Sequence, residues 1–287
     1  MERPAVDVVV PFAGDSVELE LTLARLHALR LAPGDTLVVV DNDDRPRSLR
    51  PSDIRVVRRA EQASPGYARN RGAELGQAGW LAFLDADVAP RPDLLDRLFE
   101  PPPEDRTALL AGGILDEPVP ADAPPVARYA WLRRLMSQDN TWQWGEGAFA
   151  QTANAACRRS AFEAIGGFRE GLRAAEDADL SYRLRAAGWE AERRDRAVAV
   201  HLSRRTVQAF VRNLLLHGAG GGWLAREYPS AIPGHRLPGL LWWGVRYAAR
   251  ELTSGLLHRD RDRALSGLLE PLGVISFELG RRLSTRL

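Results

Sequence analysis

Two aspartates separated by one residue follow an apolar run, because Asp85 and Asp87 come directly after Phe83-Leu84. In extended backbone, residues two apart point to the same side, so the spacing predicts neighbouring carboxylates at a strand end. Like charges this close repel unless a cation lies between them, and oxygen ligands suit Mg²⁺ or Mn²⁺ on a diphosphate. The pattern predicts an Asp-x-Asp (DXD) metal site. The alternative is turn acids that cap a helix beginning near Pro92.

A second acidic segment, residues 176–179, stands at the start of a helical pattern. Leu180, Leu184 and Ala187 recur at helical spacing and form an inward stripe. Asp177 precedes Leu180 by three residues, so its carboxylate is predicted to face the protein interior. A general base needs this placement beside an acceptor hydroxyl. The alternative is a helix cap that contributes about 1 kcal/mol.

Polar or special residues also follow two earlier apolar runs: Asp41 follows Leu37–Val40, and Pro11 with Phe12 follows Val6–Val10. Ligands of open α/β sheets bind beyond the carboxyl ends of the strands, so these ends are expected to share one cleft with the Asp-x-Asp pair. Asp41 can accept hydrogen bonds from a base or a ribose, or it can form an Asx turn in its own loop.

Two basic side chains are further candidates. Arg69 lies in a helix that begins at Ser64 and Pro65, where it reaches phosphate or lies on a solvated face. His201 ends the apolar run Ala197–Val200, and a lone histidine at such a place is structural unless acids join it.

The elements that position these residues are short apolar runs alternating with helical patterns, which predicts βαβ units and a mostly parallel sheet. Strands are expected at Val6–Val10, Leu37–Val40, Ile54–Val57, Trp80–Leu84, Thr107–Leu115 and Gly147–Ala156, and helices at Val17–Leu31, Leu94–Phe99 and Tyr129–Met136. Three long helices are expected after Val200, with a break or bend at the glycine cluster Gly218–Gly222. We predict two domains, residues 1–205 and a helical region of residues 206–287.

Composition narrows the class of protein. The 39 basic residues, all arginine, balance 38 acidic ones, so nothing draws the chain to nucleic acid. The single Cys157 excludes an internal disulfide and predicts a buried thiol in a reducing compartment. The start lacks a signal-peptide pattern and no apolar stretch is long enough to span a bilayer. We therefore expect a cytoplasmic protein, with peripheral contact at the inner face of the cell membrane left open.

Several of these motifs occur in the order typical of one family, and from about Val6 to Thr206 the chain resembles inverting glycosyltransferases of family 2 with the GT-A fold. The motifs are Val8-Val9-Val10-Pro11-Phe12, Val38-Val39-Val40-Asp41-Asn42, Ala68-Arg69-Asn70-Arg71-Gly72, Phe83-Leu84-Asp85-Ala86-Asp87, Ala153 to Ser160, Ile165-Gly166-Gly167-Phe168 and Glu176 to Leu184. The chain departs from the family at residues 43–46, which read Asp-Asp-Arg-Pro instead of a small, Ser-rich sequence. It also lacks the processive Gln-x-x-Arg-Trp signature.

The resemblance implies an α/β, Rossmann-like fold of nucleotide-diphospho-sugar transferases: a mixed sheet flanked by helices, with a helical C-terminal appendage. It implies transfer of a hexose or deoxyhexose, with inversion, from a UDP- or dTDP-sugar to a glycan, lipid-linked or small-molecule acceptor. The implied roles are nucleoside binding by Pro11, Phe12, Asp41, Arg69 and Asp85, Mn²⁺ or Mg²⁺ binding by Asp87 and His201, general-base catalysis by Asp177, and contact of Arg204-Arg205 with the departing diphosphate.

Other functions stay open from the residues alone. A nucleotidyltransferase shares the α/β plan and the acidic metal ligands, but its Gly-rich basic N-terminal loop is absent here. A catalytically silent nucleotide-sugar binder or scaffold is also compatible. The segment Leu240 to Trp243, beside Arg246 and Arg250, can meet a membrane surface, a second copy in a homodimer, or the catalytic domain.

Overall fold

The computed structural model describes residues 3–43, 53–229 and 237–285. The chain forms two compact units. The first contains the residues up to Leu115 together with Ser137–Leu202, and the second contains Asp116–Met136 and the segment from Ser203 onward. Residues 116–136 thus belong with the C-terminal helices, a long-range grouping that sequence periodicity does not reveal.

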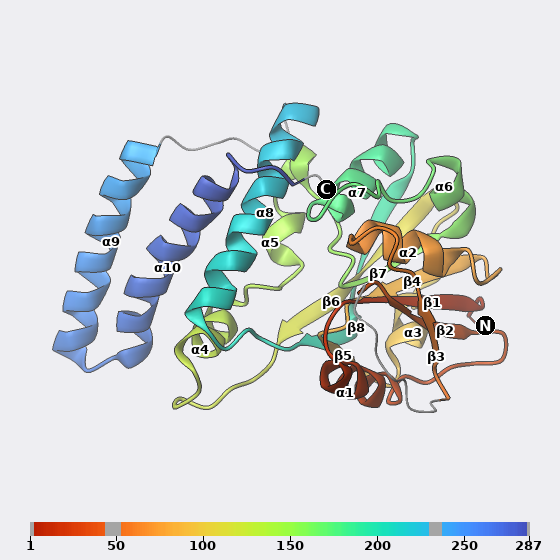
Figure 1. Cartoon of the computed structure of the whole chain (residues 1–287), viewed down its shortest axis with the longest axis horizontal. Helices are drawn as coiled ribbons and strands as arrows, with labels where there is room; N and C mark the ends of the chain where they lie inside the picture. The colour runs from red at the N-terminus through yellow and green to blue at the C-terminus, as the bar shows by residue number, and fades with distance from the viewer. Residues whose placement is uncertain (1–2, 44–52, 230–236, 286–287) are drawn as a thin grey trace. The chain divides into compact units, whose positions relative to one another are not determined.

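The first unit is built on a mixed sheet of eight strands within the described ranges, in the order β3-β2-β1-β4-β7-β6-β8-β5 (Figure 1). The strands are β1 (Val6–Phe12), β2 (Thr36–Asp41), β3 (Arg55–Arg58), β4 (Trp80–Leu84), β5 (Val88–Pro90), β6 (Thr107–Asp116), β7 (Asn154–Arg158) and β8 (Glu190–His201). Strands β3, β2, β1 and β4 are mutually parallel, whereas β7 runs antiparallel to β4 and β6, and β5 to β8. The expectation of a mostly parallel sheet therefore holds only for the N-terminal half.

The central strands are apolar on both faces because helices cover both sides of the sheet. All of β4 is buried, as are Val8, Val9 and Val10 of β1. The helices of this unit are α1 (Ser16–Leu26), α2 (Pro65–Ala73), α3 (Leu94–Leu98), α5 (Asp139–Trp142), α6 (Arg159–Ala164) and α7 (Glu176–Ala186). Helix α2 lies close against the sheet, since a Cβ on Gly72 would come 2.3 Å from Val9 Cγ1. This close approach carries Arg69 to the carboxyl ends of the strands.

Local sequence signals set several element boundaries. Ser64 caps α2 as predicted, because its hydroxyl accepts a hydrogen bond from the Tyr67 amide at 3.1 Å. The strand expected at Gly147–Ala156 is wrong over most of its length: residues before Asn154 form a short 3₁₀ turn and a loop instead. That loop is tied by the side chain of Gln138, whose Nε2 donates to the Gln151 carbonyl at 3.1 Å. Side-chain pinning of this kind leaves no periodic trace in the sequence.

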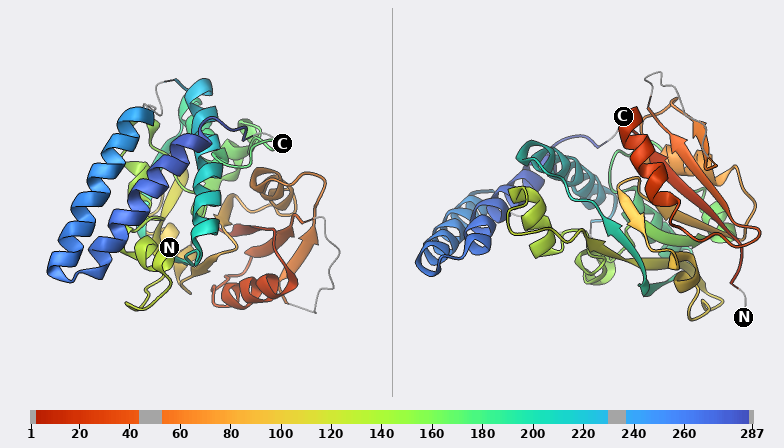
Figure 2. Two further views of the ribbon diagram at one scale, coloured as in Figure 1. Left: turned by 60° about the vertical axis from the view of Figure 1, so that its left-hand side comes forward. Right: turned by 90° about the horizontal axis from the view of Figure 1, so that it is seen from below.

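The second unit is helical and consists of α4 (Pro125–Arg133), α8 (Val207–Glu227), α9 (Leu237–His258) and α10 (Arg261–Gly280). The three long helices expected near the C-terminus are confirmed. Helix α10 lies between α8 and α9 in each view (Figure 2). The core of this second unit is a cluster of buried side chains, namely Val126, Tyr129, Phe210 and Leu269. No described helix is both long and apolar enough to cross a membrane.

The glycine cluster does not break a helix, so a break is the wrong prediction: α8 runs unbroken through Gly218–Gly222. A Cβ on Gly218 would lie 2.0 Å from the Phe277 carbonyl oxygen, and one on Gly222 would lie 2.1 Å from the Arg281 carbonyl oxygen. The glycines are therefore needed for close backbone approach between α8 and the end of α10.

Candidate active site

The two acids of the Asp-x-Asp motif lie on a turn. Strand β4 ends at Leu84, and the Val88 amide donates to the Asp85 carbonyl at 3.3 Å, so the backbone reverses between the strands β4 and β5. The prediction that Asp85 and Asp87 share an extended segment is therefore wrong, although the charge of Asp87 still acts to raise the pKa of Asp85. The turn gives the two carboxylates different partners, Arg69 for Asp85 and His201 for Asp87.

Asp87 and His201 meet because β5 pairs with β8 in a register that places Val88 opposite His201. The Leu202 amide donates to the Asp87 carbonyl at 2.9 Å, which fixes the turn against the end of β8. Asp87 Oδ2 lies 3.3 Å from His201 Nε2, with the imidazole buried and the carboxylate side chain 46% exposed. A carboxylate oxygen from the turn before β5 and an imidazole nitrogen from the end of β8 thus lie next to each other.

This pair fits an open cation site better than a closed one. Among the described residues, no group of three His, Cys, Asp or Glu side chains could hold a metal ion. Mg²⁺ and similar ions in phosphate-transfer sites use one or two protein ligands and take the others from phosphate and water. The carboxylate oxygen suits Mg²⁺ or Mn²⁺, and the imidazole nitrogen is a ligand that transition metals accept more readily than Mg²⁺ does. Asp87 and His201 are the two side chains that fit this role.

Arg69 lies between two carboxylates from distant parts of the chain. Its Nη2 donates to Asp85 Oδ1 at 2.6 Å and its Nη1 to Glu176 Oε1 at 2.7 Å. The side chain is only 3% exposed. Burial alone lowers the pKa of a guanidinium, but Asp85 and Glu176 hold the pKa of Arg69 above its ordinary value. Both terminal nitrogens of Arg69 are engaged, so this side chain holds Asp85 and Glu176 in place.

The Arg69 guanidinium also rests on an aromatic ring that is itself clamped. Its carbon lies 5.4 Å from the Phe168 ring centroid. Asn70 holds the backbone of Phe168 from both sides: its Nδ2 donates to the Phe168 carbonyl, and its Oδ1 accepts from the Phe168 amide, each at 2.9 Å. Sequence reasoning missed Asn70, Phe168 and Glu176 as parts of the site. Their signal lay in the quoted motifs, but their pairing is tertiary.

The acids at the start of α7 have separate environments. Glu176 binds Arg69, whereas Asp179 is fully buried and accepts from Arg183 at 2.8 Å and Arg169 at 3.1 Å. Asp177 accepts only from the Ala178 amide, at 2.8 Å, and forms no ion pair with another described residue. Its carboxylate is thus the one at this helix start that is left to take up a proton.

Burial, and after it the negative charge of Glu176, raise the pKa of Asp177 to about 7. Arg69 acts in the opposite direction and Asp85 in the same one, so Asp177 is electrostatically close to the strand-end cluster. Burial likewise raises the pKa of Asp85, against the pull of Arg69. A carboxyl that titrates near neutrality suits a proton acceptor.

The helix start is set by backbone conformation. Ala175 precedes α7 with φ +75, and no side chain caps the helix. Asp177 is not the N-cap residue, but it lies in the first turn and its oxygen accepts from the Ala178 amide there, so the helix-start alternative for Asp177 also fits the structure. Of the predicted inward stripe, Leu180 and Leu184 are buried, but Ala187 is exposed at the helix end.

The first two strand ends also reach this edge. Phe12 and Asp41 are register partners in β1 and β2, and both side chains are buried. Asp41 Oδ1 accepts from the Asp43 amide at 3.2 Å, as in an Asx turn. Asn42 pins the neighbouring loop by donating to the Arg59 and Gln62 carbonyls at 2.7 Å each. The departure from the family sequence at residues 44–46 lies outside the described residues.

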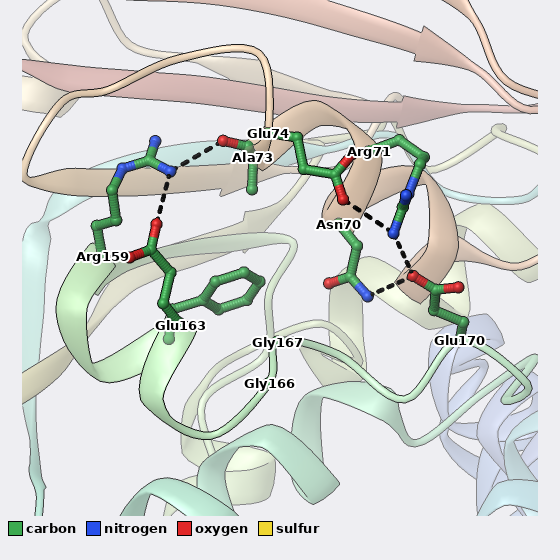
Figure 3. Close-up of a pocket in the computed structure, with 10 residues that line it drawn as sticks. Asn70, Arg71, Ala73, Glu74, Arg159, Glu163, Gly166, Gly167 and Glu170 are labelled. Atoms are coloured by element: carbon green, nitrogen blue, oxygen red, sulfur yellow. Dashed lines mark hydrogen bonds and ion pairs between the residues drawn. The ribbon is translucent and has the colours of Figure 1, made fainter.

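A pocket of about 270 Å³ lies beside α2 and α6 (Figure 3). It includes none of the acids named above. Its charges are mutually satisfied: Arg71 Nη2 lies 2.9 Å from both Glu74 and Glu170, and Arg159 donates to the Ala73 carbonyl at 2.9 Å. We therefore place the candidate site at the strand ends, where Asp177 has no such pairing.

Known proteins resemble the chain in sequence. A sequence model described as Glycosyl transferase family 2 matches residues 45–166. The pre-mycofactocin glycosyltransferases of two Mycobacterium tuberculosis strains, CDC 1551 / Oshkosh and ATCC 25618 / H37Rv, are 28% identical over 231 residues, or 78% of this chain. The chain spans 48% of the length of these relatives.

Solved structures resemble it in fold. The mannosyltransferase PcManGT from Pyrobaculum calidifontis, in complex with GDP-Man and Mn²⁺, superposes with a TM-score of 0.56 at 17% identity, covering 97% of this chain and 74% of that one. GalNAc-T7 with UDP, GalNAc and Mn²⁺ gives a TM-score of 0.51 at 16% identity, covering 71% and 44%.

The mixed sheet and these structural neighbours define the GT-A class of glycosyltransferase folds, which confirms the expected fold. Within that class, the chain is similar to glycosyltransferase family 2, through the match of residues 45–166 to the family model and the likeness to the mycobacterial glycosyltransferases.

Proposed function

We propose that this chain is a family 2 glycosyltransferase that moves a hexosyl or deoxyhexosyl group from a nucleoside-diphosphate sugar to an acceptor hydroxyl, with inversion, and that Asp177 is the general base. The observation that carries the proposal is the Asp177 carboxylate, which has a pKa of about 7, forms no ion pair with another described residue, and is electrostatically close to Arg69 and Asp85.

The donor would lie over the ends of β1, β2 and β4. In this proposal Pro11, Phe12 and Asp41 bind the nucleoside, and Asp85 assists them. Arg69 holds Asp85 in place through its hydrogen bond to Asp85 Oδ1. The two solved neighbours carry GDP-Man or UDP with Mn²⁺, which supports a nucleoside-diphosphate donor and a divalent metal. We propose a UDP- or dTDP-sugar as the donor.

Asp87 and His201 would hold the metal ion, Mn²⁺ or Mg²⁺, through one oxygen and one nitrogen. A metal bound there would stabilise the negative charge of the leaving diphosphate. The turn that separates Asp85 from Asp87 assigns the two acids to different tasks, donor positioning and metal binding.

The chemical step uses one protein proton acceptor. Asp177 takes the proton from the acceptor hydroxyl, whose oxygen attacks the anomeric carbon from the face opposite the diphosphate. The bond between that carbon and the diphosphate oxygen breaks, the nucleoside diphosphate leaves, and the configuration inverts. General-base assistance of this kind contributes about 10²–10⁴-fold to the rate.

The first experiment is a panel of nucleotide sugars with Mn²⁺, read as thermal shift and as nucleotide release. Pre-mycofactocin, named by the relatives, is one acceptor to include. If the chain is a transferase, the wild type should release nucleoside diphosphate from one of the donors. The release should be faster when the acceptor is present, and the Asp177→Asn variant should not show it. A silent binder would shift in melting temperature without releasing nucleotide. Pyrophosphate release from a nucleoside triphosphate and a sugar phosphate would instead establish a nucleotidyltransferase.

We propose that the reaction takes place in the cytoplasm.

A further inference from the structure

One face of α9 carries large apolar side chains that no described residue covers. We define the outer face of α9 by five side chains that are 51% to 77% exposed: Leu241, Trp242, Val245, Leu256 and Leu257. Leu241, Val245 and Leu256, with the exposed Ala249, recur at intervals that bring them to one side of the helix. Soluble surfaces carry such side chains singly, and a contiguous stripe of them marks an interaction site.

The opposite side of α9 is held by close packing against α10. Gly244 and Gly255 are buried there: a Cβ on Gly244 would lie 3.3 Å from Pro271 Cβ, and one on Gly255 2.8 Å from the Ala264 amide. Glycines on this side fix which way α9 faces in the hairpin, and Figure 2 shows α9 on the edge of the three long helices. The outer face is therefore presented outward by the packing of the unit.

The apolar face is bordered by cations. The guanidinium carbon of Arg246 lies 4.6 Å from the Trp242 ring centroid, and Arg250 is exposed next to it. Glu251, the one acid between Leu237 and His258, is buried and accepts from Arg250 and Arg263 at 2.8 and 2.7 Å. The rim of the outer face thus carries positive charge, and α9 itself has no further carboxylate that could pair with it.

This charge pattern decides between two occupants. A second copy packed through the same face would bring the Arg246 side chains of both copies together, and the one acid of α9, Glu251, is already engaged by Arg250 and Arg263. A bilayer with anionic lipids offers apolar depth for the tryptophan and leucines, and phosphates for the arginines. We propose that the outer face of α9 binds the surface of a membrane containing anionic lipid, with the helix lying in the plane of that surface. No described helix could cross the bilayer, so the contact is peripheral.

The test is flotation of the full chain with vesicles of phosphatidylcholine alone or mixed with phosphatidylglycerol. The wild type should float with the mixed vesicles, and less at high salt. Val245→Glu should lower the bound fraction by about tenfold, because it removes an apolar contact and sets a carboxylate against anionic lipid. Arg246→Gln with Arg250→Gln should lower it by about tenfold or more on mixed vesicles only.

Val17→Glu is the matched control, since Val17 is also a helical valine with similar exposure, 65% against 71% for Val245, but lies on α1. It should float like the wild type. Equal flotation of Val245→Glu and Val17→Glu would overturn the proposal, provided that both melt like the wild type. A dimer in vesicle-free buffer that Val245→Glu dissociates would also overturn it, in favour of a second copy. These readouts do not depend on transferase activity, so a failure here leaves the proposed reaction standing.

Discussion

The guanidinium of Arg69 joins Asp85 at the end of β4 to Glu176 at the start of α7, at 2.6 and 2.7 Å. These two acids are far apart in sequence, and one buried cation keeps them at a fixed spacing. Because Asp177 follows Glu176 directly, the same cation also sets where the proposed base stands relative to the proposed donor site. The geometry of the site therefore depends on a residue that need not touch either substrate.

Removing that cation should destabilise the protein strongly. Arg69→Met leaves the buried Glu176 and the half-buried Asp85 without this partner and is expected to lower the free energy of unfolding by about 3–5 kcal/mol. Adding Glu176→Gln should restore part of the loss, because one unpaired charge is then gone. Arg71→Met, on the same helix but partly exposed, should change stability by about 0–1 kcal/mol. Urea denaturation measures all three, and equal losses for the two arginines would contradict the buried role of Arg69.

Asp177→Asn should reduce turnover by about 10²–10⁴-fold while donor binding stays near that of the wild type. The amide keeps the size of the carboxylate but accepts no proton. Rates of nucleoside diphosphate release and calorimetry of donor binding separate the two effects. Glu163→Gln, an exposed acid on α6, serves as the control and should retain full turnover. Unchanged turnover in Asp177→Asn would remove this residue from catalysis.

The pH dependence of stability tests the same carboxyl without any substrate. The pKa of Asp177 is about 7 in the folded protein against an ordinary 3.8, so folding favours its protonated form. Its contribution to stability is present below about pH 4 and is lost as the pH rises through about 7. Since asparagine does not ionise, the melting temperature of Asp177→Asn relative to wild type should rise between these pH values and stay high above them. A difference that is flat with pH would mean that Asp177 has an ordinary pKa.

Asp87→Ala should make donor binding insensitive to metal. Calorimetry of the preferred donor with Mn²⁺ or with a chelator is expected to show tighter binding with Mn²⁺ in the wild type, by about tenfold or more, and equal affinities in the variant. His201→Gln should weaken the metal effect in the same direction. Glu74→Gln, an exposed acid, is the control for charge removal. A wild-type donor affinity that is the same with and without metal would eliminate the Asp87–His201 metal site.

Local signals in the sequence predict much of the fold. Ser64 accepts a backbone hydrogen bond at a helix start, as its type and position predict, and the structure shows the same role for Thr206 and Asp260. The early apolar runs become buried strands, and Cys157 is a fully buried thiol as expected. These features depend on neighbours a few residues away, which is the range over which periodicity and caps carry information.

The errors arise where distant residues decide the conformation. Asp85 and Asp87 read as a strand continuation, but pairing of β5 with β8 forces a turn between them. Glycines 218–222 read as helix breakers, but the carbonyls of α10 occupy the space where side chains would stand. The clamp of Asn70 on Phe168 joins residues 98 positions apart. No pattern within a short window reports such pairings.

The shortness of β5 has a consequence for how this chain tolerates insertions and deletions. The strand β5 has three residues, Val88–Pro90, and with the hydrogen bond from the Leu202 amide to Asp87 it holds the turn against the long strand that ends at His201. One residue gained or lost in β8 would rotate successive side chains to the opposite face of the sheet, so the imidazole would turn away while the protein could still fold. Insertion or deletion of one residue in β8 should therefore abolish metal binding while the protein still folds, and it should separate these two properties more cleanly than many point substitutions would.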